Sequence, residues 1–150
     1  MVYSGGCQCG AVRFKVASSL GEASICHCRM CQKAFGSWGA AFVAVDKASL
    51  TWTRGAAAEF RSSAIVNRGF CAGCGTPLYM HEHGDNQIEL AIGSLDTPGA
   101  IQKISRESGV ESKLHWFAQL HNLPAETTAE SRTAADMLQL KSLQHPDHDT

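Results

Sequence analysis

The sequence has no long apolar segment and no excess of charge of either sign. No apolar run approaches the roughly 18 residues that a membrane-spanning helix needs. The opening MVYSGGCQCG lacks the basic and apolar regions of a secretory signal. The 13 basic and 14 acidic side chains give a formal net charge of −1, which indicates neither an anionic membrane nor a nucleic acid as partner. We therefore expect a cytoplasmic protein.

Aromatic residues are also scarce. They make up 7% of the chain and are not interleaved with Lys or Arg, which disfavours nucleic-acid binding by zinc knuckles. Apolar residues nevertheless reach 44% of the 150 residues, which is enough for the core of one domain of ordinary size.

Cysteine, in contrast, is plentiful and clustered. The chain has 7 cysteines, in three groups: CQC at 7–9, CHCRMC at 26–31 and CAGC at 71–74. An odd number cannot pair fully as disulfides within one chain, and a reducing compartment disfavours disulfides altogether. Metal binding is therefore the leading interpretation of these cysteines.

Two of the groups together supply the thiolates of a structural zinc site. Cys7 and Cys9 lie two residues apart, so on an extended segment they would point to the same side and meet one metal ion. Cys71 and Cys74 form a Cys-x-x-Cys knuckle, which needs two more ligands from elsewhere. These four cysteines would complete a closed, tetrahedral site.

That assignment leaves Cys26, Cys28 and Cys31 together as a second group. Three protein ligands and one open position are the arrangement of catalytic zinc, in which water or a substrate takes the fourth place. We therefore interpret this group as a catalytic zinc site.

Spacing leaves an alternative open, in which the knuckle pairs with two cysteines of CHCRMC and Cys7 and Cys9 remain free. A redox-active dithiol at 71–74 is disfavoured, because the glycines and the proline around it oppose the helix that such a motif normally begins. His27 alternates with its cysteine neighbours, so it is expected to face the other way, as a core or surface residue rather than a ligand.

Short segments with strand patterns separate the cysteine groups. Alternating residues, apolar runs and Gly-rich turns predict strands at 11–16, 40–45, 50–53, 58–61, 65–70, 78–81 and 87–92. Gly84, Asp85 and Asn86 would form the turn between the last two. Many short strands with such turns predict a mainly β domain.

The composition changes after Pro124. Residues 125–144 lack glycine and proline and are rich in helix-forming residues, which predicts a weakly amphipathic helix. Thr127 or Thr128 would cap this helix, with Glu130 placed for a capping box. We therefore divide the chain into a zinc domain at 1–124 and a helical extension at 125–150, whose final HPDHDT is expected to be frayed.

The cysteine motifs and their surroundings resemble one known family. GGCQCGAVRF, ICHCRMCQKAFGS, RGFCAGCGTPLY and AIGSLDTP, in this order, are similar to the motifs of the glutathione-dependent formaldehyde-activating family, also called the GFA or CENP-V/GFA domain family. The resemblance covers roughly residues 4–116. It implies an Mss4-like fold, with antiparallel β-sheets around a structural zinc site.

The resemblance also implies two zinc ions and an activity. The structural ion would be bound by the cysteines of CQC and CAGC, and a more labile catalytic ion by the three of CHCRMC. The activity of the family is the condensation of formaldehyde with glutathione to S-hydroxymethylglutathione, classed as a carbon–sulfur lyase reaction. The alternative is a binding module without turnover, built on the same scaffold for a protein or a small thiol, although a pure scaffold needs no open zinc site.

Glutathione carries two carboxylates, so a cationic rim is expected near the three cysteines. We assign Lys33 and Arg68 to this rim as ligand-binding residues. Arg13, Arg54 and Arg61 are expected to be solvated surface charges.

The segment SRESGVESKLHWF departs from the family pattern. Glu107 stands where family members commonly have a histidine, Gly109 where an aromatic residue is expected, and His115 where proline is expected. We expect this end of the domain to shape the ligand pocket, so the departure bears on the substrate more than on the fold.

Overall fold

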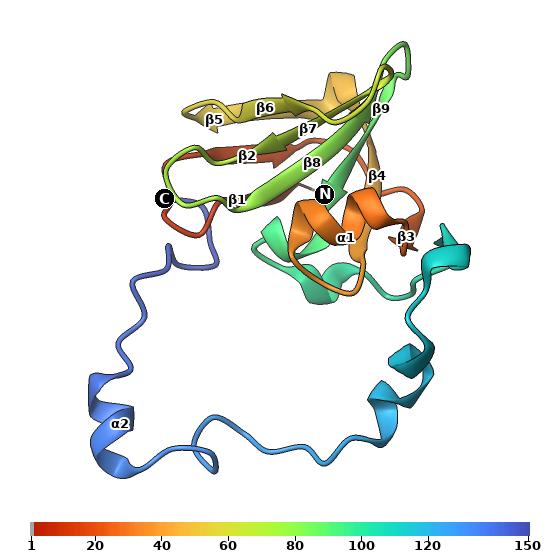
Figure 1. Cartoon of the computed structure of the whole chain (residues 1–150). Helices are drawn as coiled ribbons and strands as arrows, with labels where there is room; N and C mark the ends of the chain where they lie inside the picture. The colour runs from red at the N-terminus through yellow and green to blue at the C-terminus, as the bar shows by residue number, and fades with distance from the viewer. Residues whose placement is uncertain (1) are drawn as a thin grey trace.

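The structure is a computed structural model that describes residues 2–150, and it is mainly β (Figure 1). Its α-helices are α1 (Arg29–Phe35) and α2 (Ala134–Gln139). Its strands are β1 (Tyr3–Gly6), β2 (Arg13–Val16), β3 (Ala23–Cys26), β4 (Ala40–Asp46), β5 (Leu50–Arg54), β6 (Ala58–Arg61), β7 (Val66–Phe70), β8 (Pro77–Glu82), β9 (Gln87–Ala91) and β10 (Arg106–Ser108). The expected fold class is confirmed, including a helix in the C-terminal region.

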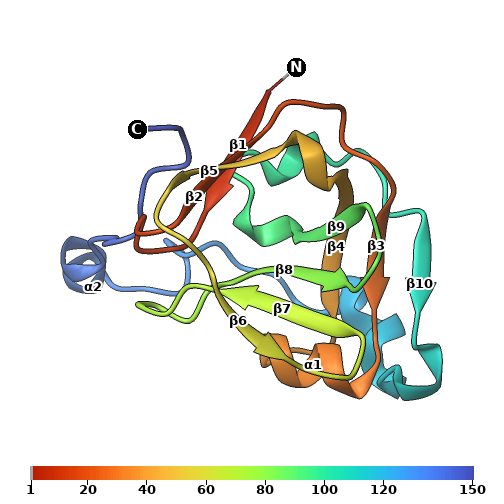
Figure 2. The same cartoon turned by 90° about the horizontal axis from the view of Figure 1, so that it is seen from above.

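The strands form two sheets. The larger sheet has seven strands in the order β10-β3-β4-β9-β8-β7-β6, and the smaller has three in the order β1-β2-β5. All pairs are antiparallel except β10 with β3, which is parallel. In Figure 2, α1 and the smaller sheet lie on opposite sides of the larger sheet.

Alternation along β4 divides the core between these two sides. Val43 and Val45 belong to the main core, which also contains Phe14 and Val16 of the smaller sheet. Phe42 belongs to a second cluster around α1. Because successive side chains of a strand point to opposite faces, β4 is buried on both, which explains the absence of polar residues from AAFVAV.

The predicted strands correspond to β2 and β4–β9, with ends shifted by one or two residues. The predicted turn between β8 and β9 is confirmed, since the Gln87 N–H donates to Asp85 Oδ1 at 2.9 Å. The predicted elements do not include β1, β3, β10 and α1. The start of α1 has no usual sequence signal, because its N-cap is Cys28, whereas the usual N-cap residues are Ser, Thr, Asp and Asn.

The helix of the C-terminal extension is shorter than predicted and begins later. Thr133 caps α2 and forms a capping box with Asp136. Thr127 and Glu130 do hydrogen-bond to each other, but within a turn, so the prediction of the cap was wrong. Residues 121–144 are exposed, and the chain passes away from the sheets (Figure 1).

The end of the chain, which we expected to be frayed, returns to the smaller sheet. The His145 N–H donates to the Gln8 carbonyl at 2.8 Å, and Lys15 forms an ion pair with Asp149 at 2.6 Å. The final residues HPDHDT are therefore held by a backbone hydrogen bond and an ion pair, and the expectation that they fray is wrong. Among residues 2–150, no helix is long and apolar enough to span a membrane.

Candidate metal centres

One cluster of cysteines forms where two loops meet. Cys7 and Cys9 follow β1, and Cys71 and Cys74 follow β7. Their Sγ atoms all lie within 4.8 Å of one another, with 3.6 Å between Cys7 and Cys9 and 3.8 Å between Cys9 and Cys71. A tetrahedral zinc ion with Zn–S bonds of about 2.3 Å holds its sulfurs about 3.8 Å apart. The four thiols could therefore hold one metal ion, and their separations suit zinc.

Hydrogen bonds to sulfur support this four-cysteine cluster. The Val12 N–H donates to Cys7 Sγ at 3.2 Å. Cys74 Sγ lies 3.1 Å from the Thr76 hydroxyl. Burial raises the pKa of Cys74, but hydrogen bonds from the Thr76 hydroxyl and N–H outweigh it and bring the pKa to about 6. Cys74 is thus prepared as a thiolate, the form that binds metal.

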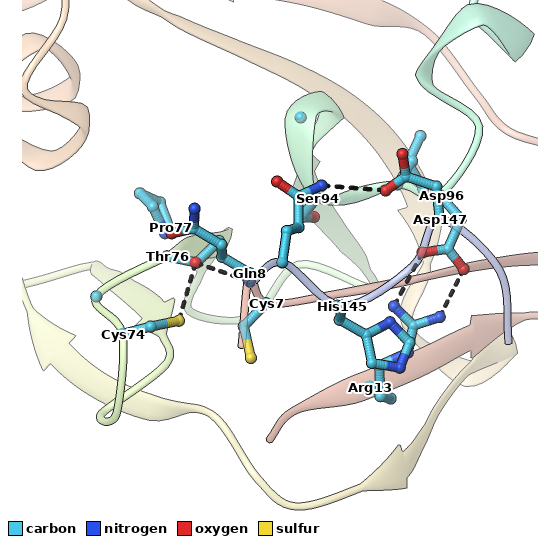
Figure 3. Close-up of a pocket in the computed structure, with 15 residues that line it drawn as sticks. Cys7, Gln8, Arg13, Cys74, Thr76, Pro77, Ser94, Asp96, His145 and Asp147 are labelled. Atoms are coloured by element: carbon cyan, nitrogen blue, oxygen red, sulfur yellow. Dashed lines mark hydrogen bonds and ion pairs between the residues drawn. The ribbon is translucent and has the colours of Figure 1, made fainter. Parts of the chain in front are cut away.

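A cavity of about 400 Å³ beside this cluster is lined by an ion pair between Arg13 and Asp96 (Figure 3). Buried Arg13 donates two hydrogen bonds to the Asp96 carboxylate, at 2.9 and 2.6 Å. The Ser4 hydroxyl donates to the same carboxylate at 2.5 Å. Arg13 is 2% exposed and paired with Asp96, so the expectation that it is a solvated charge is wrong.

The other three cysteines meet at the start of α1. Cys26 ends β3, Cys28 caps the helix and Cys31 lies in its first turn. Their Sγ atoms lie within 4.8 Å of one another, with 3.3 Å between Cys26 and Cys28. Among residues 2–150, no other His, Cys, Asp or Glu side chain joins these three thiols as a potential metal ligand. The geometry gives a three-thiol centre with room for a further ligand.

His27, between two of these cysteines, faces the other way as expected. Its side chain is fully buried and packs edge-on against the Phe117 ring, with 4.8 Å between centroids. It is not part of the three-cysteine centre.

The three cysteines line a pocket of about 470 Å³ on the face of the larger sheet that carries α1. Phe42 and Met80 supply apolar parts of its wall. The charged side chains that line it come from several strands and one turn: Arg68, Glu82, Asp85, Glu89 and Arg106. A small polar molecule could therefore reach the thiols and meet charges of both signs.

Arg68 contacts the three-cysteine centre directly. Its side chain is buried, with Nη2 3.4 Å from Cys31 Sγ and Nε donating to the Ser62 hydroxyl at 3.1 Å. Nη1 is buried and has no hydrogen-bond partner in the structure. A buried donor without a partner is costly, so this nitrogen is a natural contact for a bound acceptor.

The thiols of the centre differ in acidity. Burial raises the pKa of Cys31 to about 12, although Arg68 acts against this. Burial also raises the pKa of Cys26, but hydrogen bonds from the Ser108 hydroxyl and the Cys28 backbone reverse the effect and leave the pKa lowered. Cys26 therefore ionises before Cys31.

The two predicted ligand-binding residues have different surroundings. Arg68 lies in the cysteine pocket, as described. Lys33 is exposed on α1 and borders a neighbouring groove with Met30 and Phe60. Arg68 also borders this groove and so connects the two.

The divergent segment does shape the pocket, but not through Glu107. On β10, Arg106 and Ser108 line the pocket. Glu107 lies between them and forms an ion pair with Lys113 at 2.7 Å, close to His27. Its position in an alternating strand turns it away from the cysteines.

The predicted site residues do not include Glu89, Arg106 and Ser108, which line the pocket. A signal for Glu89 was present, since in QIELAI it stands between two apolar residues and must face away from the core. No local signal marks Arg106 and Ser108, because their position depends on the pairing of β10 with β3, about 80 residues earlier.

The fold and the clusters define a mainly β domain with two thiol-rich candidate metal centres, and comparison with known proteins places it in a family. The family model for glutathione-dependent formaldehyde-activating enzyme matches residues 2–113, so the chain belongs to the GFA family.

Two individual proteins are similar to this chain. An uncharacterised lyase of Schizosaccharomyces pombe is 33% identical over 85 residues, which are 56% of this chain and 61% of that relative. A solved Rhodobacter sphaeroides protein has a TM-score of 0.56 at 18% identity, covering 70% of this chain and 99% of that one. The second likeness shows a shared fold.

Proposed function

We propose that this protein is a zinc-dependent carbon–sulfur lyase of the GFA type. It would join a small thiol similar to glutathione to a small aldehyde such as formaldehyde, giving an S-hydroxymethyl adduct. Family membership and the printed name of the fungal relative support the class of reaction. The observation that carries the proposal is the contrast between the clusters, because one offers four thiols and the other offers three beside a pocket.

The donor sets suit zinc at both centres, with a structural role for the four-cysteine cluster and a labile, catalytic role for the other. Zinc bound at the three-cysteine centre would hold the substrate sulfur as a thiolate at neutral pH. Three thiolates already give the metal a negative set of ligands, which favours capture of a thiol over polarisation of an aldehyde.

The chain's own residues would bind and orient the substrates. Arg68 Nη1, which has no partner in the structure, would donate to a carboxylate of the thiol substrate. Lys33, which lines the adjoining groove, would meet a second carboxylate. The walls formed by Phe42 and Met80 would exclude water beside the reacting sulfur and leave space for a small aldehyde.

Exchange NMR on labelled formaldehyde and glutathione, mixed with the zinc-loaded protein, tests this function. The adduct also forms without a catalyst, so the quantity to measure is the rate of interconversion. We expect the wild type to accelerate it and Cys28→Ser to lose the acceleration while it keeps its fold and one zinc ion. A folded, zinc-loaded wild type that gives no acceleration would overturn the lyase and favour the binding module.

A further inference from the structure

A carboxyl group enters the cysteine pocket from the middle of the larger sheet. Glu89 lies on β9 between Ile88 and Leu90, which are 4% and 0% exposed in the main core. Alternation therefore directs Glu89 to the opposite face, where it lines the same pocket as Cys26, Cys28 and Cys31.

The register of the sheet places Glu89 near Arg68. Glu89 pairs with Met80 on β8, and Met80 pairs with Arg68 on β7. Neighbouring strands lie about 4.8 Å apart, so about 10 Å separates the backbones of Glu89 and Arg68. Because Arg68 reaches Cys31 and Glu89 lines the same pocket, a small adduct on the thiol centre would lie in a pocket that both side chains line.

The Glu89 carboxyl is incompletely hydrogen-bonded. Its Oε2 is buried without a hydrogen-bond partner in the structure. Glu59, in contrast, accepts hydrogen bonds from the Tyr79 hydroxyl at 2.5 Å and from Asn67 at 2.8 Å. A carboxyl that served only to hold the sheet together would be expected to have such partners.

The surroundings of Glu89 raise the pKa of its carboxyl, which makes the carboxylate a better proton acceptor. Burial is the largest cause that raises its pKa; Arg106 lowers it, and the acidic groups Asp85, Glu22 and Glu82 raise it further. The residues opposite Glu89 on the two neighbouring strands, Ala44 and Met80, carry no charge. The pKa is raised overall, so the carboxyl can hold a proton closer to neutral pH than an exposed glutamate.

We propose that Glu89 carries the proton in the reaction at the three-cysteine centre, an assignment that rests on the proposed lyase function. The S–H proton of the substrate passes to the Glu89 carboxylate as the thiol becomes a thiolate. The sulfur electron pair then forms the C–S bond, the C=O π pair moves to oxygen, and this oxygen takes the proton from Glu89. The carboxylate is regenerated, and the thiol and aldehyde have become the adduct without loss or gain of a proton.

Exchange rates measured between pH 5 and 9 with Glu89→Gln test the proposal. Glutamine keeps the size of the side chain but cannot carry the proton. Glu111→Gln is the control, because Glu111 is exposed and lies outside the pocket. Glu89→Asp keeps a carboxyl, and we expect it to retain part of the activity.

We expect Glu89→Gln to lower the catalysed exchange rate about 10²- to 10⁴-fold, the usual contribution of a general acid–base group. The Kd for glutathione, measured by calorimetry, should stay unchanged. The wild-type rate should fall below the pKa of Glu89, because a protonated carboxyl cannot take the S–H proton, and this limb of the profile should be absent from the variant. A Glu89→Gln protein with the wild-type rate and pH profile would refute the role of Glu89 alone. A wild type without catalysis would refute the lyase function and the role of Glu89 with it.

Discussion

Replacing Asp96 with asparagine tests how the structure stabilises the loop that carries the first two cysteines. Asp96 bonds Arg13 twice and Ser4 once, and it thereby joins the strands on both sides of the Cys7 loop to the segment after β9. The Arg13 and Asp96 side chains are 3% and 7% exposed. The substitution leaves the guanidinium buried without its counter-charge.

Removing one partner of a buried ion pair costs about 3–5 kcal/mol. Asparagine keeps one acceptor oxygen, so we expect the lower end, about 3 kcal/mol of the free energy of unfolding. For a chain of this size, each kcal/mol corresponds to about 2–4 °C in Tm. The expected fall in Tm is therefore about 6–12 °C.

Urea unfolding of the zinc-loaded protein, followed by circular dichroism, measures this loss. Asp149→Asn is the matched control, because it breaks the exposed ion pair with Lys15 and should cost at most about 1 kcal/mol. Adding Arg13→Met to Asp96→Asn should recover part of the stability by removing the unpaired charge. If Asp96→Asn costs no more than the control, the reasoning about the buried pair is refuted.

Three further predictions follow from the same structure. Burial raises the pKa of Asp96, but the Arg13 and Ser4 hydrogen bonds lower it overall. The stabilisation that Asp96 contributes is therefore complete above an ordinary aspartate pKa of about 3.9 and is lost as the pH falls through the lowered pKa. Over this acidic range, the free energy of unfolding of Asp96→Asn should depend less on pH than that of the wild type. Cys71→Ser removes a ligand of the proposed structural zinc site and should unfold the protein or lower its zinc content. A variant that melts normally with full zinc content would exclude that role. Gly109→Ala places a Cβ 2.6 Å from the Cys28 backbone nitrogen, at a residue with a φ of +62°, so it should weaken metal binding at the three-cysteine centre. Gly99→Ala, which has open space around the new Cβ, should not. Equal metal content in both variants would contradict this prediction.

The cysteine clusters were predictable because their ligands come in closely spaced pairs and triplets, and few chemistries other than metal binding suit seven cysteines so arranged. The strands with clear alternation, such as β2 and β9, were predictable for a similarly local reason. The burial of Arg13 in an ion pair could not be predicted from local sequence, because its partner Asp96 lies 83 positions away. The same applies to Arg106, which lines the pocket only because β10 pairs with β3.

The proposed function depends on a second zinc ion at the three-cysteine centre, with an open position for a thiol. Native mass spectrometry of the zinc-loaded wild type and of Cys28→Ser, each with and without glutathione, tests it most directly. We expect two zinc ions and one bound glutathione in the wild type, and one zinc ion without glutathione in a folded Cys28→Ser protein. A single zinc ion in both proteins, or equal binding of glutathione to both, would contradict it.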